Sequence, residues 1–272
     1  MRPISVADMI EVDRLMVDEY GITLLQMMEN AGRSLAATAR RMLGGNTAGR
    51  RVLVLVGKGN NGGGGLVAAR HLANAWAQVT VALAAEPDEL SEVPGRQLGT
   101  LQRIGIDGSD RSTSWEDLPA LLAGTDLVLD ALVGYSLSGA PREPVAGLIR
   151  AANAAHVPRL ALDIPSGLDG DSGIPRDPCL RADATLTLAW PKVGLLSEKA
   201  RPYVGDLYLT DIGVPDPVYR ALGMDRGQIF ARGPIVRVEV QGGNWCVPLS
   251  SEESEAWRQQ SHGIRKEQSC DK

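Results

Sequence analysis

The sequence has few aromatic, cysteine and histidine residues. Phe, Trp and Tyr make up 4% of its 272 residues, with a single Phe, and there are three cysteines and three histidines. Cys179, Cys246 and Cys270 form no C-x-x-C pair and no disulfide framework, and the histidines do not have the spacing of zinc ligands. These absences argue against a disulfide-stabilised secreted scaffold and a zinc protein, and they predict a reduced, cytoplasmic setting.

Long hydrophobic runs and clustered positive charge are missing as well. No apolar run approaches the roughly 18 residues of a membrane span, and residues 1–8 lack the apolar core of a signal peptide. The net charge is −5, and no basic patch is interleaved with aromatic residues. Neither a membrane nor a nucleic acid is therefore expected as a partner. The hydrophobic share of 44% is still enough for the core of one large α/β domain or two small ones.

Apolar, β-branched segments alternate with helical patterns from residue 51 onward. Before them, residues 5–43 carry two helical apolar stripes separated at Gly21. Strands are predicted at residues 52–56, 79–84, 127–130, 160–163, 184–188 and 206–210, the last as an edge strand, and helices near residues 68–76 and 144–155. Strands separated by helices predict a Rossmann-like three-layer α/β sandwich, with a mostly parallel sheet and helices on both faces.

The segment from about residue 223 onward has a different character. It contains scattered polar residues and a charged end with little periodicity. One further strand is predicted at residues 236–240, and the last 20 or so residues are predicted to be weakly ordered. We therefore expect a domain over residues 1–222 and an atypical, partly disordered tail over residues 223–272.

The most distinctive motif is the glycine-rich segment that follows the first strong strand. Residues 57–65 read Gly-Lys-Gly-Asn-Asn-Gly-Gly-Gly-Gly, and a helical pattern begins at Leu66. Gly57, Gly59 and Gly62 fit the G-x-G-x-x-G spacing, which alone is a weak signal. A strand, a glycine turn and a helix together place backbone N–H groups where they can face a phosphate at the helix N-terminus. The two asparagines add amide side chains beside that backbone.

Two predicted strands end in an aspartate that is followed by a tight polar turn. Asp130 and Asp163 occupy these positions, and Asn61 lies at the end of a third strand. Ligands of open α/β sheets bind outside the carboxyl ends of the strands, although a lone aspartate there is often only a helix cap or an Asx-turn. Asn61, Asp130 and Ser166 offer oxygen donors for a cation. A single carboxylate is too little charge for a calcium cage and suits a monovalent ion better.

Four ordered motifs resemble the YjeF N-terminal domain, the fold of NAD(P)H-hydrate epimerase. They are Gly-Lys-Gly-Asn-Asn-Gly-Gly (57–63), Asp-Ala-Leu-Val-Gly-Tyr-Ser (130–136), Asp-Ile-Pro-Ser-Gly-Leu-Asp (163–169) and Ala-Trp-Pro-Lys (189–192). Residues 26–32 and 211–215 are similar to the same family. The resemblance covers about residues 1–222, and its order and spacing make it far more specific than a lone G-x-G-x-x-G.

The resemblance implies an isomerase of nicotinamide cofactor repair. Members of the family interconvert the R and S epimers of hydrated NADH and NADPH (NADHX and NADPHX), so that an S-specific dehydratase can restore the nicotinamide. The resemblance implies that the hydrated dinucleotide is bound by Asn60, Asn61, Gly62, Gly63, Gly64, Gly134, Tyr135, Ser136, Leu137, Ser138, Gly139, Ala140 and Asp163. It also implies a potassium ion held by Asn61, Asp130 and Ser166.

Epimerisation requires the hydrated carbon to lose and regain its configuration, by eliminating and re-adding water or by opening and closing the ring. Either route needs proton transfer, which a positioned carboxylate assists. We predict that Asp130 is this acid–base group, beside the potassium ion, and that Asp163 orients the nicotinamide ribose or ring. A separate NAD(P)H-hydrate dehydratase is the expected functional partner, because residues 223–272 do not resemble the start of such a domain. The amphipathic N-terminal helices are the expected surface of a homodimer.

One residue departs from the family pattern. The family usually reads Asn-Asn-Gly-Gly-Asp-Gly, and here Gly64 replaces the acid. Glycine permits the same backbone path but fixes it less firmly. An alternative therefore stays open, a degenerate YjeF-like module that binds a nucleotide or a protein without turnover. The intact Asn61, Asp130 and Asp163 oppose this alternative.

Two other classes of nucleotide-binding protein fit less well. A nicotinamide dehydrogenase needs an acid at the end of the second strand, for which Glu86 is only a loose candidate. A P-loop NTPase is excluded because no G-x-x-x-x-G-K-[ST] motif occurs. Near the family motifs, a solvated surface position is favoured for Lys192 over a phosphate contact, and Tyr135 and Ser136 fit a ligand role and a turn role equally.

Overall fold

A single eight-stranded sheet runs through the part of the chain that the computed structural model describes, which is residues 1–106, 108–109, 118–241 and 244–248. The strand order is β3-β2-β1-β4-β5-β6-β7-β8, and every pairing is parallel except that of β7 with β8. The strands are β1 (Arg51–Val56), β2 (Gln78–Leu83), β3 (Gly108–Ser109), β4 (Leu127–Ala131), β5 (Arg159–Leu162), β6 (Ala184–Leu188), β7 (Asp206–Thr210) and β8 (Ile235–Arg237). The predicted mostly parallel sheet is confirmed.

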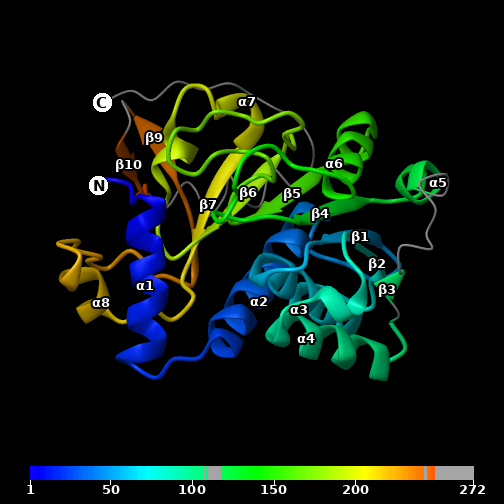
Figure 1. Ribbon diagram of the computed structural model, residues 1–272, viewed down its shortest axis with the longest axis horizontal. Helices are drawn as coiled ribbons and strands as arrows, with labels where there is room; N and C mark the ends of the chain where they lie inside the picture. The colour runs from blue at the N-terminus through cyan, green and yellow to red at the C-terminus, as the bar shows by residue number, and fades with distance from the viewer. Residues whose placement is uncertain (107, 110–117, 242–243, 249–272) are drawn as a thin grey trace.

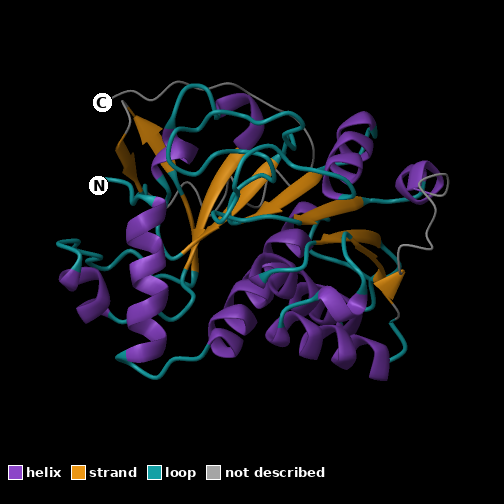
Figure 2. Cartoon of the chain, in the orientation of Figure 1, coloured by secondary structure: helices purple, strands orange, loops and turns teal. Residues whose placement is uncertain are grey.

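Helices cover both faces of this sheet, as Figure 1 and Figure 2 show. The α-helices are α1 (Val6–Asp18), α2 (Leu24–Met42), α3 (Asn60–Asn74), α4 (Glu92–Arg103), α5 (Leu118–Ala123), α6 (Val145–Ala154), α7 (Arg201–Val204) and α8 (Asp216–Ala221), with short 3₁₀ helices η1 (Pro87–Glu89) and η2 (Val193–Leu196). In Figure 1, α2, α3 and α4 lie on one side of the sheet, and α5 and α6 lie on the other. No helix within the described residues is both long and apolar enough to cross a membrane.

Successive side chains of β1 point to opposite faces of the sheet and pack in two separate parts of the hydrophobic core. Val52, Val54 and Val56 pack in one hydrophobic cluster with residues of α2, α3 and α4. Leu53 and Leu55 point the other way and pack with residues of α5 and α6. Successive side chains of a strand face opposite sides of a sheet, so a strand that is buried on both faces reads as a continuous apolar run. This is why the sequence pattern identified β1 correctly.

The glycine-rich segment is helical, which differs from the predicted turn. The helix begins at Asn60 rather than at Leu66, with Gly59 as its N-cap. The reason is close packing. An added Cβ would lie 2.3 Å from Met28 Sδ at Gly63 and 2.5 Å from Ala131 Cβ at Gly65. Glycine in a helix costs roughly 1 kcal/mol relative to alanine, and here it lets α3 lie directly against α2 and β4.

Two details near the end of the described chain differ from the predictions. The strand β7 is not at the edge of the sheet, because β8 pairs with it. The predicted strand at residues 236–240 is divided at Val238 into β8 and β9 (Glu239–Gln241), and β9 pairs with β10 (Asn244–Cys246) in a second, two-stranded sheet. The chain forms two short strands in place of one because β8 pairs with β7 in the main sheet, whereas β9 pairs with β10 in the second sheet.

The residues after β9 pack against the beginning of the chain. The buried Trp245 meets Trp190 edge to face, with ring centroids 4.9 Å apart. The carbonyl oxygen of Arg2 accepts hydrogen bonds from the indole N–H groups of both tryptophans. The described part of the 223–272 segment thus joins the hydrophobic core, and the predicted weakly ordered end, residues 249–272, lies outside the described residues.

Candidate active site

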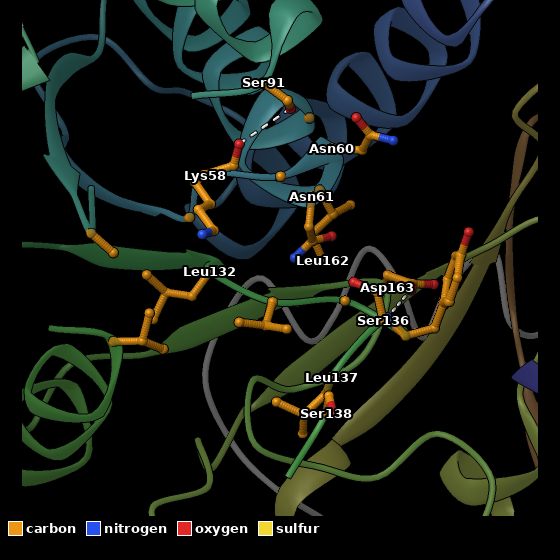
Figure 3. A pocket seen from close by; sticks show the side chains of 18 of the residues that line it. Lys58, Asn60, Asn61, Ser91, Leu132, Ser136, Leu137, Ser138, Leu162 and Asp163 are labelled. Atoms are coloured by element: carbon orange, nitrogen blue, oxygen red, sulfur yellow. Dashed lines mark hydrogen bonds between the residues drawn. The ribbon is translucent and has the colours of Figure 1, made fainter. Parts of the chain in front are cut away.

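A cavity of about 1190 Å³ opens at the carboxyl ends of the central strands. Its lining comes from α1 and α2, from the segments after β1, β4 and β6, and from the end of β5. The strand order reverses between β1 and β4, which is the position where open α/β sheets bind ligands. Figure 3 shows the side chains from these separate elements meeting around one space.

The segment after β1 brings its backbone close to the segment after β4. A Cβ added at Gly57 would lie 1.8 Å from the carbonyl oxygen of Leu132, and one added at Gly62 would lie 1.9 Å from the carbonyl oxygen of Gly57. Only glycine allows this path, so the first turn of α3 can reach the cavity. Lys58 and Asn60 line the same side of the cavity.

The predicted binding residues fall into two groups. Those that line the cavity are Asn60, Asn61, Gly64, Gly134, Tyr135, Ser136, Leu137, Ser138, Ala140 and Asp163. Gly62, Gly63 and Gly139 are not among the lining residues. The first two of these three instead make room for backbone and for the Met28 side chain.

Gly134 separates two polar side chains of the cavity. A Cβ added there would lie 3.0 Å from Asp163 Oδ2 and 3.2 Å from Asn61 Oδ1. The Nδ2 atom of Asn61 is buried and has no hydrogen-bond partner in the described structure. A buried donor without a partner is costly, so this amide is available to a bound molecule or ion.

Lys192 is a component of the site, and its predicted position on the surface is wrong. Its side chain is 0% exposed, and its Nζ lies 2.6 Å from Asp163 Oδ1. The ammonium also donates to the carbonyl oxygen of Leu188 at 2.8 Å. The backbone of Lys192 also pairs with that of Ile4 in an isolated parallel bridge, which ties this segment to the beginning of the chain. A contact between residues so distant in sequence leaves no local pattern.

The carboxylate of Asp163 is held from two sides. Lys192 binds Oδ1, and the backbone N–H of Tyr135 donates to Oδ2 at 3.1 Å. The backbone of Asp163 is left-handed, with φ of 69°. Non-glycine residues adopt this conformation at a cost, and such residues cluster at functional sites. The fold therefore fixes this carboxylate firmly at the cavity wall.

Asp13 of α1 is a second carboxyl group of the cavity, and sequence reasoning missed it. The hydroxyl group of Tyr135 donates a hydrogen bond to Asp13 Oδ2. Burial raises the pKa of Asp13 above its ordinary value, against the opposite effect of that hydrogen bond. In the sequence Asp13 is one polar position on an amphipathic helix, 122 residues from Tyr135, so no local signal distinguishes it.

Asp130 lies deeper than these groups. It is 0% exposed and accepts hydrogen bonds from the backbone N–H and hydroxyl of Ser166 and from the backbone N–H of Leu132. Burial raises the pKa of Asp130 to about 6, although these hydrogen bonds lower it. Neither Asp130 nor Ser166 is among the residues that line the cavity. Asp130 and Ser166, which the resemblance implies as ligands of one ion, are thus in contact with each other, and the structure places that contact behind the cavity wall.

Comparison with known proteins identifies the family. The model of the family described as YjeF-related protein N-terminus matches residues 24–194. An NAD(P)H-hydrate epimerase from Dehalogenimonas lykanthroporepellens is 47% identical over 240 residues, which are 87% of this chain and 92% of the relative. The chain belongs to the YjeF N-terminal family. The match begins after α1, so Asp13 lies outside the residues that the family model covers.

Other relatives of this YjeF N-terminal domain differ in length. An NAD(P)H-hydrate epimerase from Pirellula staleyi is 38% identical, over 75% of this chain and 89% of the relative. A bifunctional NAD(P)H-hydrate repair enzyme, Nnr, from Moorella thermoacetica is 37% identical over 88% of this chain, but the match spans only 46% of that enzyme. The crystal structure of yeast ynu0 superposes with a TM-score of 0.75 at 28% identity, covering 87% of this chain and all of that chain.

Restoring the family acid at Gly64 is expected to destabilise this domain unless Leu162 makes room. A Cβ added at Gly64 would lie 2.7 Å from Leu162 Cδ2. Overpacking a core of this kind typically costs about 1–3 kcal/mol. We expect Gly64→Asp to lower the free energy of unfolding, and the double variant with Leu162→Val to lose less than the sum of the two single variants, as measured by denaturant titration.

The matched control is Gly95→Asp, because a Cβ at that helical glycine meets nothing within 4 Å. Strictly additive effects of Gly64→Asp and Leu162→Val would show that the two positions do not compete for space.

Proposed function

We propose that this chain interconverts the R and S epimers of hydrated NADH and NADPH. The observation that carries the proposal is the cavity in which the glycine-rich start of α3 and a set of fixed acid and base side chains meet. Two relatives of similar length are named NAD(P)H-hydrate epimerase, which supports the same activity. We place the activity in the cytoplasm, in keeping with the free thiol of the buried Cys179.

The two sides of the cavity suit the two parts of such a substrate. The start of α3 presents unpaired backbone N–H groups and the positive end of a helix dipole, which favour the phosphates. Lys58 lies beside this helix start and adds a positive charge. On the other side, the side chains of Asp13, Tyr135 and Asp163 offer hydrogen-bonding groups to the hydrated ring.

The proposal includes a potassium ion held by Asn61, Asp130 and Ser166, of which the last two are in direct contact. Asp130 is a buried carboxylate for which the described residues offer no cationic side chain, and Ser166 Oγ lies 2.7 Å from it. Ser166 Oγ also lies 3.2 Å from the carbonyl oxygen of Val133, so a carboxylate, a hydroxyl and a carbonyl oxygen lie close together. Within the described residues no group of three or more His, Cys, Asp or Glu side chains is placed to hold a metal ion, and the oxygen donors of Asn61, Asp130 and Ser166 favour a monovalent ion over a transition metal.

When bound, the ion supplies a fixed positive charge close to the start of α3. Asp130 and Ser166 would hold the ion on the side away from the cavity. The amide of Asn61, whose nitrogen has no partner in the described structure, would turn its oxygen toward the ion. The acid–base role of Asp130 stays a prediction, because its carboxylate lies behind the lining of the cavity.

The bifunctional relatives support a partner for the reaction. In the Moorella enzyme, the part similar to this chain is 46% of a protein named as a bifunctional repair enzyme. We infer that a separate dehydratase consumes the S epimer that this chain supplies. A homodimer through α1 and α2 is part of the proposal, and analytical ultracentrifugation tests it.

The decisive experiment measures R-to-S interconversion of NADHX by NMR or HPLC, in potassium buffer and in choline buffer of equal ionic strength. We expect interconversion well above the spontaneous rate, and a rate several-fold higher in potassium, because the ion neutralises the buried Asp130 carboxylate. Acceleration that is identical in both buffers would refute the ion site alone. No acceleration by folded protein would favour the non-catalytic binding module, for which Gly64 is the specific observation.

A further inference from the structure

Four carboxyl groups line the cavity, and they differ in what neutralises them. Glu143 pairs with Arg150 at 2.8 Å, and Asp163 pairs with Lys192 at 2.6 Å. Glu89 is exposed and accepts a hydrogen bond from the backbone N–H of Glu86. Asp13 is half-buried, and within the described residues no cationic side chain lies within ion-pair distance of it. Asp13 is therefore the cavity carboxyl group that combines partial burial with the absence of an ion pair among the described residues.

The surroundings of Asp13 suit an uncharged ring. Its hydrogen-bond partner Tyr135 packs against a hydrophobic cluster that includes Met9, Met27 and Ile212, and all three of these side chains also line the cavity. A carboxyl group beside apolar side chains holds its proton to a higher pH than one in water. A carboxylic acid in such a place is able to act as a general acid at a higher pH than an exposed aspartic acid.

We propose that Asp13 is a catalytic residue of the epimerase and exchanges a proton with the hydroxyl group of the hydrated nicotinamide ring. The inference rests on the proposed function and names the proton-transfer group within that same site. It assigns the transfer to a residue of α1 that contacts the cavity directly.

The step balances as an elimination followed by an addition. The Asp13 carboxylic acid gives its proton to the ring hydroxyl, the carbon–oxygen bond breaks, and water leaves. The lone pair of the neighbouring ring nitrogen forms a carbon–nitrogen double bond, so the ring becomes a cation beside the Asp13 carboxylate. Water then adds to the opposite face of the same carbon, the double bond returns its electrons to nitrogen, and the proton released from that water passes through solvent water to the Asp13 carboxylate.

The groups that face Asp13 are consistent with this role. Tyr135 donates its hydroxyl hydrogen to Asp13, while Lys192 lowers and Asp163 raises the pKa of the Asp13 carboxyl through space. Burial raises the pKa of the Tyr135 hydroxyl, so this phenol stays protonated and is not the base. The Lys192 ammonium lies 5.9 Å above the ring of Tyr135 and is bound to Asp163. Asp13 alone among these groups combines access to the cavity with a proton that it is able to release.

The test compares Asp13→Asn, Asp13→Glu and Tyr135→Phe in the full chain by steady-state NADHX epimerisation. We expect Asp13→Asn to lower kcat about 100-fold, in the range typical of lost general acid–base catalysis, with KM within about threefold of the wild type. The wild-type kcat should fall as pH rises through the Asp13 pKa, because the acid form is consumed, and Asp13→Asn should lose this limb of the profile. Tyr135→Phe keeps the carboxyl group and should lower kcat less than tenfold.

Asp18→Asn, an exposed position on the same helix, is the matched control for helix charge. Asp13→Glu keeps a titratable group. Its kcat should be reduced but should still fall as pH rises, so the proposal stays testable if the asparagine variant does not fold. Equal losses in Asp13→Asn and Tyr135→Phe would overturn the proposal, because Asp13 would then act only by holding Tyr135. A folded Asp13→Asn variant with near wild-type kcat would overturn it too, while an inactive wild type would overturn the proposed function itself.

Discussion

Replacing Lys192 with methionine is expected to lower the melting temperature by about 10 °C and to abolish most of the epimerase activity. The ammonium is fully buried and binds the carboxylate of Asp163 at 2.6 Å. Removing one member of a buried ion pair leaves an uncompensated charge, which typically costs about 3–5 kcal/mol. For a protein of this size, each kcal/mol shifts the melting temperature by about 2–4 °C. Activity should fall because the freed Asp163 carboxylate no longer keeps its position at the cavity wall.

The double variant Lys192→Met with Asp163→Asn separates stability from function. With both charges removed, much of the lost stability should return, because a buried pair is often replaceable by neutral groups. Activity should not return, since the oriented carboxylate is gone. Lys199→Met, at an exposed lysine nearby, is the control for loss of one positive charge. Lys192→Met with a wild-type melting temperature would contradict the buried pair, and wild-type kcat in that variant would contradict its positioning role.

Asp130→Asn is expected to remove the potassium response and to lower turnover about 100-fold, a loss typical of removing one preorganised electrostatic group. The substitution conserves shape, but it eliminates the carboxylate charge that Ser166 and Leu132 surround. Rates in potassium and choline buffers should then be equal, and circular dichroism should show a folded protein. Asp88→Asn, at an exposed position, is the control. A variant that still responds to potassium would place the ion elsewhere.

The Asp130→Asn variant also distinguishes Asp130 from Asp13 as the group that transfers the proton. If Asp130→Asn keeps the pH profile of the wild type at reduced rate, proton transfer belongs to another group, as the inference for Asp13 requires. Suppose instead that kcat no longer falls with rising pH in Asp130→Asn but still does so in Asp13→Asn. That result would support the acid–base role that the sequence predicted for Asp130.

Much of the fold was predictable because the relevant signals are local. The buried strands β1, β4 and β6 read as short apolar runs, and Asp130 and Asp163 follow from their places where strands end. The contact of Asp130 with Ser166 was implied by family motifs that lie only 36 residues apart. In each of these cases the sequence around the residue determines its surroundings.

The remaining features depend on contacts between distant parts of the chain. Lys192 binds Asp163, which lies 29 residues earlier in the chain, and Asp13 reaches the cavity because α1 packs near the segment after β4. The glycines of α3 are poor helix formers, so their propensity predicted a turn. Tertiary packing against α2 and β4 reversed that preference. The position of β7 likewise depends on β8, which returns from beyond residue 222.

The glycines of α3 also limit how this protein can be engineered. Exchanging glycine for alanine inside a helix is a common route to higher thermal tolerance, because it restricts the unfolded chain. In α3 that route is closed at Gly62 and Gly65, where the smallest possible side chain would collide with the backbone of Gly57 and with the Cβ of Ala131. Consensus or library design should therefore hold these two positions constant and seek stabilising changes at glycines with open space, such as Gly95 in α4.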